Sequence, residues 1–174
     1  QLPLIADADT GFGEEEMIRR TVLEYNFAGA AGLHLEDQDF PKRCGHLDGK
    51  ELVSVEQMVS KVQWAAKASE DYSDGAFMIC ARTDAKGVDG FDAAVERAKA
   101  YVEAGASMIF PEGLTSEQEF ADFAKAMDAM GDKRPYLLAN MTEFGKTPML
   151  TLDQFGAMGY NIVIYPVNTL RIAM

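Results

Sequence analysis

Short apolar segments alternate with amphipathic segments six times along the chain. The apolar segments are rich in Ile, Leu, Val and Phe with little polar alternation, which is typical of strands buried on both faces of a parallel sheet. The segments between them carry apolar residues at helical spacing, as in Phe91, Ala94 and Ala98. This alternation predicts six consecutive βα units and an α/β fold with a parallel sheet. The expected strands are residues 2–6, 31–35, 76–81, 107–110, 136–139 and 161–165.

Local signals place the helix ends at the same period. A Ser or Thr followed three residues later by Gln or Glu is typical of a capped helix start, and a Gly before the next strand is typical of a left-handed helix end. The expected capping pairs are Ser54 with Gln57, Ser116 with Glu119 and Thr151 with Gln154, and the expected terminal glycines are Gly29, Gly105, Gly131 and Gly159.

Each predicted strand is followed by polar or charged residues. In a (β/α)8 TIM barrel the carboxyl ends of all strands meet at one mouth, where active sites lie, whereas a doubly wound sheet gathers function in one crevice. Acids, an arginine and amides at every strand end therefore favour the barrel. These residues are Asp7 and Asp9, Glu36 and Asp37, Arg82 and Asp84, Glu112, Asn140 and Asn168.

The number of units is lower than a complete barrel requires. Eight units usually take about 250 residues. We therefore expect residues 1–174 to form a single, partial (β/α)8 catalytic domain of about six units, with the first strands and the C-terminal helices missing from this sequence.

Composition and charge limit the partners. The formal net charge of −12 opposes binding to nucleic acid and to anionic membranes, so we expect neither. No apolar run is long enough for a membrane span, and the first residues do not read as a secretory signal. Two cysteines, Cys44 and Cys80, cannot build a disulfide framework, and we expect a cytoplasmic protein.

One connection is roughly 17 residues longer than the others and lies between the second strand and the following helix. This segment, residues 38–50, places Lys42, Arg43 and His46 around Cys44 in an otherwise acidic chain. Nearby positive charge lowers the pKa of a thiol, so we expect thiolate chemistry or rapid proton exchange at Cys44. A long loop at a barrel mouth is often a catalytic lid. The alternative is a surface loop whose basic residues only aid solubility.

Three carboxylates are expected at one place in the mouth. Asp7 and Asp9 are two residues apart at the first strand end and should project to the same side, next to Glu36 from the neighbouring strand. Unpaired carboxylates would repel one another, and a divalent cation removes that cost. Oxygen ligands without His or Cys favour Mg²⁺, or Mn²⁺, over zinc.

The remaining strand ends predict a small polycarboxylate substrate. Arg82 presents a guanidinium that matches a carboxylate, and Asn140 and Thr142 add neutral hydrogen bonds. The backbone amides at Gly45 and His46 could form part of a small anion-binding nest.

Five stretches of the chain together resemble the isocitrate lyase / phosphoenolpyruvate mutase superfamily, and within it the 2-methylisocitrate lyases most closely. The Lys-Arg-Cys-Gly-His loop is a specific lyase signature, whereas isocitrate lyases typically show Lys-Lys-Cys-Gly-His and carry large insertions. The compact form of this chain therefore favours the methylisocitrate branch. The stretches are residues 7–13, 36–38, 42–46, 81–85 and 140–145.

The resemblance implies a function and an assembly. The implied reaction is Mg²⁺-dependent cleavage of a carbon–carbon bond of 2-methylisocitrate to pyruvate and succinate, in the methylcitrate cycle of propionate catabolism. The implied assembly is a homotetramer, a dimer of dimers with swapped helices. Cys44 would donate a proton to the departing succinate. The implied metal ligands are Asp7, Asp9 and Glu36, the implied catalytic set is Cys44, Lys42, Arg43 and His46, and the implied substrate contacts are Cys44, Gly45, Arg82, Glu112, Asn140, Met141, Thr142 and Arg171.

Two alternatives stay open. A sister enzyme could act on another small diacid through the same metal and arginine, as an isocitrate lyase, a dimethylmalate lyase or an oxaloacetate decarboxylase does. The chain could also be a non-catalytic barrel fragment. The intact loop around Cys44 argues against such a fragment, while the missing strands argue for it. The family's Ser-Gly-Gly carboxylate loop, a further metal-associated aspartate and the tyrosine proposed as base lie on strands outside this sequence.

Overall fold

A curled, all-parallel sheet forms the centre of the molecule. The computed structural model describes residues 2–143, 145 and 147–174. The strands pair in the order of the sequence, β1-β2-β3-β4-β5-β6. This order confirms the predicted barrel class, because a doubly wound sheet would reverse its order partway. The strands are β1 (Ile5–Asp7), β2 (Gly32–Glu36), β3 (Met78–Thr83), β4 (Met108–Pro111), β5 (Tyr136–Asn140) and β6 (Ile162–Ile164).

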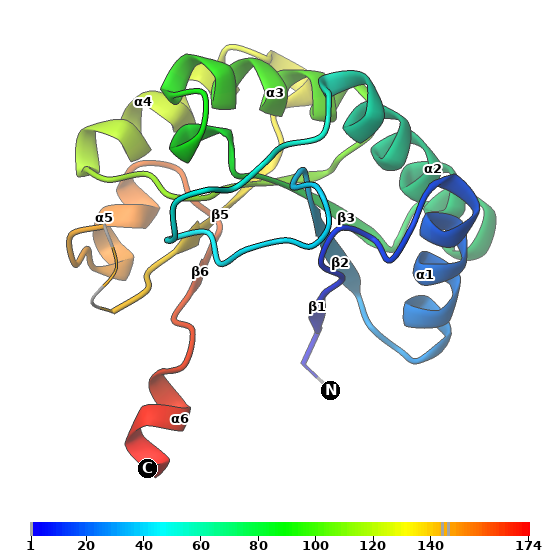
Figure 1. Cartoon of the computed structure of the whole chain (residues 1–174), viewed down its shortest axis with the longest axis horizontal. Coiled ribbons are helices and arrows are strands. Elements are labelled where there is room, and N and C mark those ends of the chain that lie inside the picture. The colour runs from blue at the N-terminus through cyan, green and yellow to red at the C-terminus, as the bar shows by residue number, and fades with distance from the viewer. Residues whose placement is uncertain (1, 144, 146) are drawn as a thin grey trace.

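Helices cover the convex face of this sheet. Figure 1 shows α1 to α5 in an arc around the strands, with the amino terminus and α6 on the open side. No helix of the described residues has the length and apolar content needed to cross a bilayer. The α-helices are α1 (Glu15–Phe27), α2 (Val55–Ser73), α3 (Phe91–Glu103), α4 (Glu117–Asp128), α5 (Leu152–Ala157) and α6 (Asn168–Ala173), and the 3-10 turns are η1 (Ala85–Gly87) and η2 (Gly131–Lys133).

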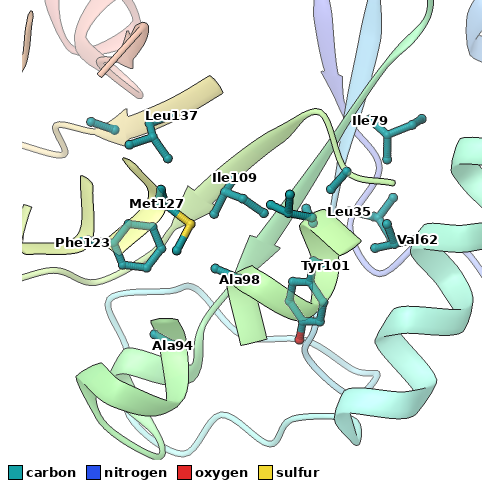
Figure 2. Packing of buried hydrophobic residues seen from close by; sticks show 14 of the residues in the cluster. Leu35, Val62, Ile79, Ala94, Ala98, Tyr101, Ile109, Phe123, Met127 and Leu137 are labelled. Atoms are coloured by element: carbon teal, nitrogen blue, oxygen red, sulfur yellow. The ribbon is translucent and has the colours of Figure 1, made fainter. Parts of the chain in front are cut away.

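Alternation along the strands divides the apolar residues between two clusters. The larger cluster fills the space between the sheet and the helices, and Figure 2 shows Leu35, Ile79 and Ile109 of the strands within it. The smaller cluster lies on the concave face and contains Cys80 and Phe110. Since side chains two apart share a face, Glu36, Arg82 and Asn140 face the concave side, where the inside of a barrel would be.

The helix-end signals are confirmed in most cases. Complete capping boxes start α2 and α5, and the four expected terminal glycines have positive φ. The predicted box at Ser116 closes on one side only. Ser116 accepts a hydrogen bond from the Glu119 amide, but the Glu119 carboxylate binds the backbone amide and the hydroxyl of Thr115 instead.

The first strand begins later than predicted. It starts at Ile5 rather than Leu2 and ends at Asp7. Asp9 therefore lies beyond the strand, in a left-handed conformation with φ of 48°. The reason is local, because the Asp7 carboxylate accepts a hydrogen bond of 2.8 Å from the Asp9 amide and turns the backbone.

Candidate active site

Arg82 lies at the centre of the carboxyl ends of the strands. It is the register partner of Glu36 on β2, and its Nη1 is 3.4 Å from Glu36 Oε2. Asp84 binds the same guanidinium in two places, at 2.9 Å from Nε and 3.1 Å from Nη2. Burial opposes the charge, but the carboxylates of Asp84, Glu112 and Glu36 raise the pKa of Arg82. Arg82 thus keeps its charge and still has N–H groups on both Nη atoms to offer a ligand.

The long loop folds back over these strand ends. Its base is closed by a hydrogen bond of 2.8 Å from the Asp39 amide to the Glu51 carbonyl. The Gln38 side chain binds both backbone polar groups of Arg43, at 2.8 and 2.9 Å. Buried Lys50 donates from Nζ to the carbonyls of Gly45 and Leu47. The loop is therefore an ordered element braced by its own side chains.

These hydrogen bonds within the loop place Gly45 and His46 against the carboxyl ends of β3 and β4. A Cβ placed on Gly45 would lie 2.6 Å from Arg82 Nη2 and 2.7 Å from Glu112 Cδ, so only glycine fits there. The next residue places His46 Nε2 at 3.3 Å from Glu112 Oε1. The loop and the ends of β3 and β4 thus form one contiguous polar surface.

A chain of hydrogen bonds extends this surface to β5. The Asn140 amide donates to Glu112 Oε2 at 3.1 Å, and the Thr142 hydroxyl donates to Asn140 Oδ1 at 2.8 Å. Glu112 is buried. The structure therefore brings Arg82, Glu112, Asn140 and Thr142 together at one end of the sheet, and their binding of a substrate stays a prediction.

A second group of charges lies at the end of β1 and β2. Lys42 Nζ is 2.8 Å from Asp9 Oδ1 and 3.7 Å from Glu36 Oε1. Partial burial opposes the charge of Lys42, yet the hydrogen bond to Asp9 and the charge of Glu36 raise its pKa. Asp7 Oδ1 lies 3.6 Å from His34 Nε2 on the concave face. Lys42 therefore supplies the positive charge between two of the three predicted metal ligands.

The surroundings of Glu36 indicate whether the ends of β1 and β2 suit a bound cation. Both of its carboxylate oxygens are buried and lack a hydrogen-bond partner among the described residues. Burial raises its pKa to about 7, although Arg82 and Lys42 oppose that change. A buried carboxylate that is hard to ionise fits a divalent cation, which would stabilise its charged form.

The carboxylates at the ends of β1 and β2 are the type of ligand that Mg²⁺ prefers, but they are not arranged as a preformed coordination site. Within the described ranges no group of three Asp, Glu, His or Cys side chains stands close enough to hold a metal ion. Mg²⁺ usually takes only one or two protein carboxylates and keeps several waters. The oxygen donors of Asp7, Asp9 and Glu36 are compatible with it, and the three-residue metal site stays a prediction.

Comparison with known proteins identifies the family. The family model described as phosphoenolpyruvate phosphomutase matches residues 1–174. The chain belongs to that family. A probable 2-methylisocitrate lyase of Corynebacterium glutamicum is 58% identical to it over 174 residues, which are 99% of this chain and 54% of that protein. A 2-methylisocitrate lyase of Aeropyrum pernix is 55% identical over all of this chain and 53% of that protein.

Solved structures agree with this assignment. A crystal structure of 2,3-dimethylmalate lyase, described as a PEP mutase/isocitrate lyase superfamily member, matches with a TM-score of 0.89 and 37% identity. The match covers 98% of this chain and 55% of that one. The chain therefore spans about half the length of the relatives it matches.

Three predicted site residues of this phosphomutase-family chain are placed differently from the rest. Arg171 lies exposed on α6, where its guanidinium is 3.1 Å from the Glu143 carboxylate. The Met141 side chain is buried in the larger cluster, between the sheet and the helices. Cys44 is exposed on the loop, while the side chains of Lys42 and His46 contact carboxylates. Phe144, part of the motif at residues 140–145, lies outside the described residues.

Sequence reasoning missed three residues that shape the site of this phosphomutase-family chain. Asp84 was noted at a strand end but not as the partner of Arg82. Gln38 and Lys50 brace the loop, and each was only one of many polar residues in a long connection. The usable signal was the i, i+2 spacing of Arg82 and Asp84, which puts both on one face of β3 and its extension.

Proposed function

We propose that the protein carrying this chain is a Mg²⁺-dependent carbon–carbon lyase that cleaves 2-methylisocitrate to pyruvate and succinate. The observation that supports it most is the seating of the Lys-Arg-Cys-Gly-His loop. Gly45 packs against Arg82 and Glu112, and His46 contacts Glu112. Relatives named 2-methylisocitrate lyase at 55–58% identity support the same activity.

Arg82 and its neighbours bind the substrate carboxylates in this proposal. The free N–H groups on its Nη atoms face a mouth that Gly45 keeps narrow. Asn140 and Thr142 orient the substrate through neutral hydrogen bonds. Glu112 accepts a hydrogen bond from Asn140 and lies 3.3 Å from His46 Nε2, so it orients one substrate contact and lies beside one member of the proposed catalytic set.

Cleavage then follows a retro-aldol course. The substrate hydroxyl gives its proton to a base, which the resemblance places on a tyrosine outside this chain. The C–O bond becomes the pyruvate carbonyl as the carbon–carbon bond breaks, and the electron pair stays on the succinate carbon. The Cys44 thiol, exposed on the loop, donates its proton to that carbon and leaves a thiolate. Arg82 stabilises the negative charge that develops on the leaving group.

Asp7, Asp9 and Glu36 would hold Mg²⁺, or Mn²⁺, in this proposal. When bound, the cation supplies Lewis-acid stabilisation of negative charge on substrate oxygens. Lys42 must then release at least part of its contact with Asp9 and Glu36, because its ammonium stands between them.

A related activity on another small diacid is the second candidate. The structural similarity to a 2,3-dimethylmalate lyase favours it, since metal and arginine contacts would be shared. Cytoplasmic location is also part of the proposal, supported by two free cysteines. The homotetramer that the family resemblance implies is part of the proposal as well.

A substrate panel tests the proposal. The complete protein is assayed with Mg²⁺ against 2-methylisocitrate, isocitrate, 2,3-dimethylmalate and oxaloacetate, with pyruvate formation followed for the first. We expect the highest kcat/KM for 2-methylisocitrate. A higher value for another diacid would support the second candidate, and no turnover of any would contradict both.

A further inference from the structure

A buried carboxylate behind the proposed substrate site, Asp37, gathers four hydrogen bonds. Its Oδ2 accepts from the Thr83 hydroxyl at 2.7 Å, from the Tyr101 hydroxyl at 2.8 Å and from Arg97 Nη1 at 3.4 Å. Its Oδ1 accepts from the Asp84 amide at 2.9 Å. Asp37 is fully buried. Helix α3 thus reaches the sheet through Arg97 and Tyr101 at this one carboxylate.

The same residue holds the backbone that directly follows the Cα of Arg82. Asp37 donates its own amide to the Arg82 carbonyl at 3.2 Å. Its carboxylate holds Thr83 and Asp84, the next two residues. Asp84 in turn clamps the Arg82 guanidinium through Nε and Nη2. The backbone that follows Arg82 and the Nε and Nη2 side of its guanidinium are therefore tied to Asp37, directly or through Asp84.

Stability alone is a weak explanation for this arrangement. Removing a carboxylate from water is costly, and a buried ion pair is often no more stable than apolar residues of similar volume. Hydrogen bonds have preferred directions, however. The bonds from Asp37 fix Asp84, and Asp84 fixes the Arg82 guanidinium to the fraction of an ångström that binding a planar carboxylate requires.

We infer that Asp37 is a positioning residue that aims Arg82 at a carboxylate of the substrate. It does not touch the substrate itself, and α3 contributes through Tyr101 and Arg97. The inference rests on the proposed function, because it takes Arg82 as the ligand of that carboxylate.

Thr83 separates this role from simple packing. Thr83→Val keeps the shape of the side chain but removes the hydrogen bond to Asp37 and the bond that the hydroxyl accepts from the Ala85 amide, whereas Thr83→Ser keeps the hydroxyl and removes a methyl group. Positioning depends on the hydroxyl and packing depends on the methyl. If Asp37 positions Arg82, Thr83→Val should bind succinate more weakly than Thr83→Ser. If the side chain only packs, Thr83→Ser should bind succinate more weakly than Thr83→Val.

The experiment uses the complete protein, with succinate as the probe for binding and 2-methylisocitrate for kinetics. We expect Thr83→Val to weaken succinate binding at least tenfold and to lower kcat/KM at least tenfold, because Arg82 both binds the substrate carboxylate and stabilises charge on the leaving group. Thr83→Ser should bind succinate within threefold of the wild type even where its Tm falls. A milder variant, Tyr101→Phe, should weaken binding three- to tenfold. Equal affinities in Thr83→Val and the wild type, or a weaker Thr83→Ser, would overturn the inference.

Arg82→Lys tells this failure apart from failure of the proposed function. It keeps the charge but loses the planar guanidinium. If it weakens succinate binding more than tenfold while Thr83→Val and Tyr101→Phe do not, Arg82 is the ligand and Asp37 does not position it. If it binds succinate as the wild type does, the proposed use of Arg82 is wrong, and the inference falls with it.

Discussion

Gly45 is a residue at which the loop approaches the strand ends closely. Any side chain there would overlap the Arg82 guanidinium and the Glu112 side chain. These two groups belong to the proposed binding surface, so they cannot move aside without changing it. The absence of a side chain at Gly45 is therefore a condition for the loop to close on the strand ends.

Gly45→Ala should lower kcat/KM by at least a hundredfold. The added methyl group lifts the loop from Arg82, which removes His46 from Glu112. The Tm should change little, because the larger apolar cluster between the sheet and the helices is untouched. Gly156→Ala in α5 is the matched control, since a Cβ there meets nothing within 4 Å. Activity of Gly45→Ala near that of the control would contradict the seating of the loop.

The raised pKa of Glu36 predicts that the free energy of unfolding depends on pH. Burial raises its pKa to about 7 in the folded chain, from an ordinary value of 4.5. The folded state therefore holds this proton more tightly than the unfolded state. The stabilisation is complete below pH 4.5 and is lost as the pH rises through 7.

Glu36→Gln removes this titration. In chelator, its free energy of unfolding relative to the wild type should rise between pH 4.5 and 7.5, by on the order of 2 kcal/mol once solvent access at the mouth is allowed for. Urea unfolding at several pH values measures the difference. Saturating Mg²⁺ should reduce or reverse it. A difference that does not vary with pH would contradict the assigned pKa of Glu36.

The loop of residues 38–50 is the element that changes a strand edge into a site. Its shape comes from polar side chains that bind its own backbone, chiefly Gln38 at Arg43 and Lys50 at Gly45. Such contacts bridge short sequence distances and need no apolar packing. An element of this kind can open without unfolding the sheet below it.

Lys50→Met should loosen this loop. The variant keeps most of the aliphatic stem but cannot donate to the carbonyls of Gly45 and Leu47. We expect trypsin to cleave after Lys42 or Arg43 at least fivefold faster, and kcat/KM to fall at least tenfold. Lys125→Met, at an exposed position of α4, is the control. Unchanged cleavage and activity in Lys50→Met would show that the loop does not depend on this brace.

Periodicity predicted most elements of the sheet and helices. The alternation that buries Leu33 and Leu35 against the helices also turns Glu36 to the concave face, so strand order and the side of the site followed from the sequence. The end of β1 was harder to predict, because Asp7 and Asp9 form a turn through their own polar groups that leaves Asp9 beyond the strand. Apolar patterns do not record such contacts.

The interior of the site was harder to predict than its location. Arg82 was expected to be free for a ligand, but Asp84 and Glu36 take part of its guanidinium. Lys42 was expected near the Cys44 sulfur, and its ammonium contacts Asp9 instead. These pairings depend on how the loop folds over the strands, which charge and spacing along the chain do not determine. The lowered pKa expected for the Cys44 thiol stays a prediction.

At the scale of the whole molecule, the helices, the sheet and the loop serve one concave polar surface. Six parallel strands deliver their carboxyl ends to one mouth, and the arc of helices holds the sheet in its curled shape (Figure 1). In the proposed function, this surface cleaves a bound diacid with a proton from the loop.

Cys44→Ser in the complete protein tests this proposed proton transfer, with Cys80→Ala in the smaller cluster on the concave face as the control. A hydroxyl is a far weaker acid than a thiol, so turnover of 2-methylisocitrate should fall at least a thousandfold while succinate and Mg²⁺ bind as in the wild type. Cys80→Ala should keep its activity within threefold. Turnover of Cys44→Ser near that of the wild type would contradict the proposed proton transfer.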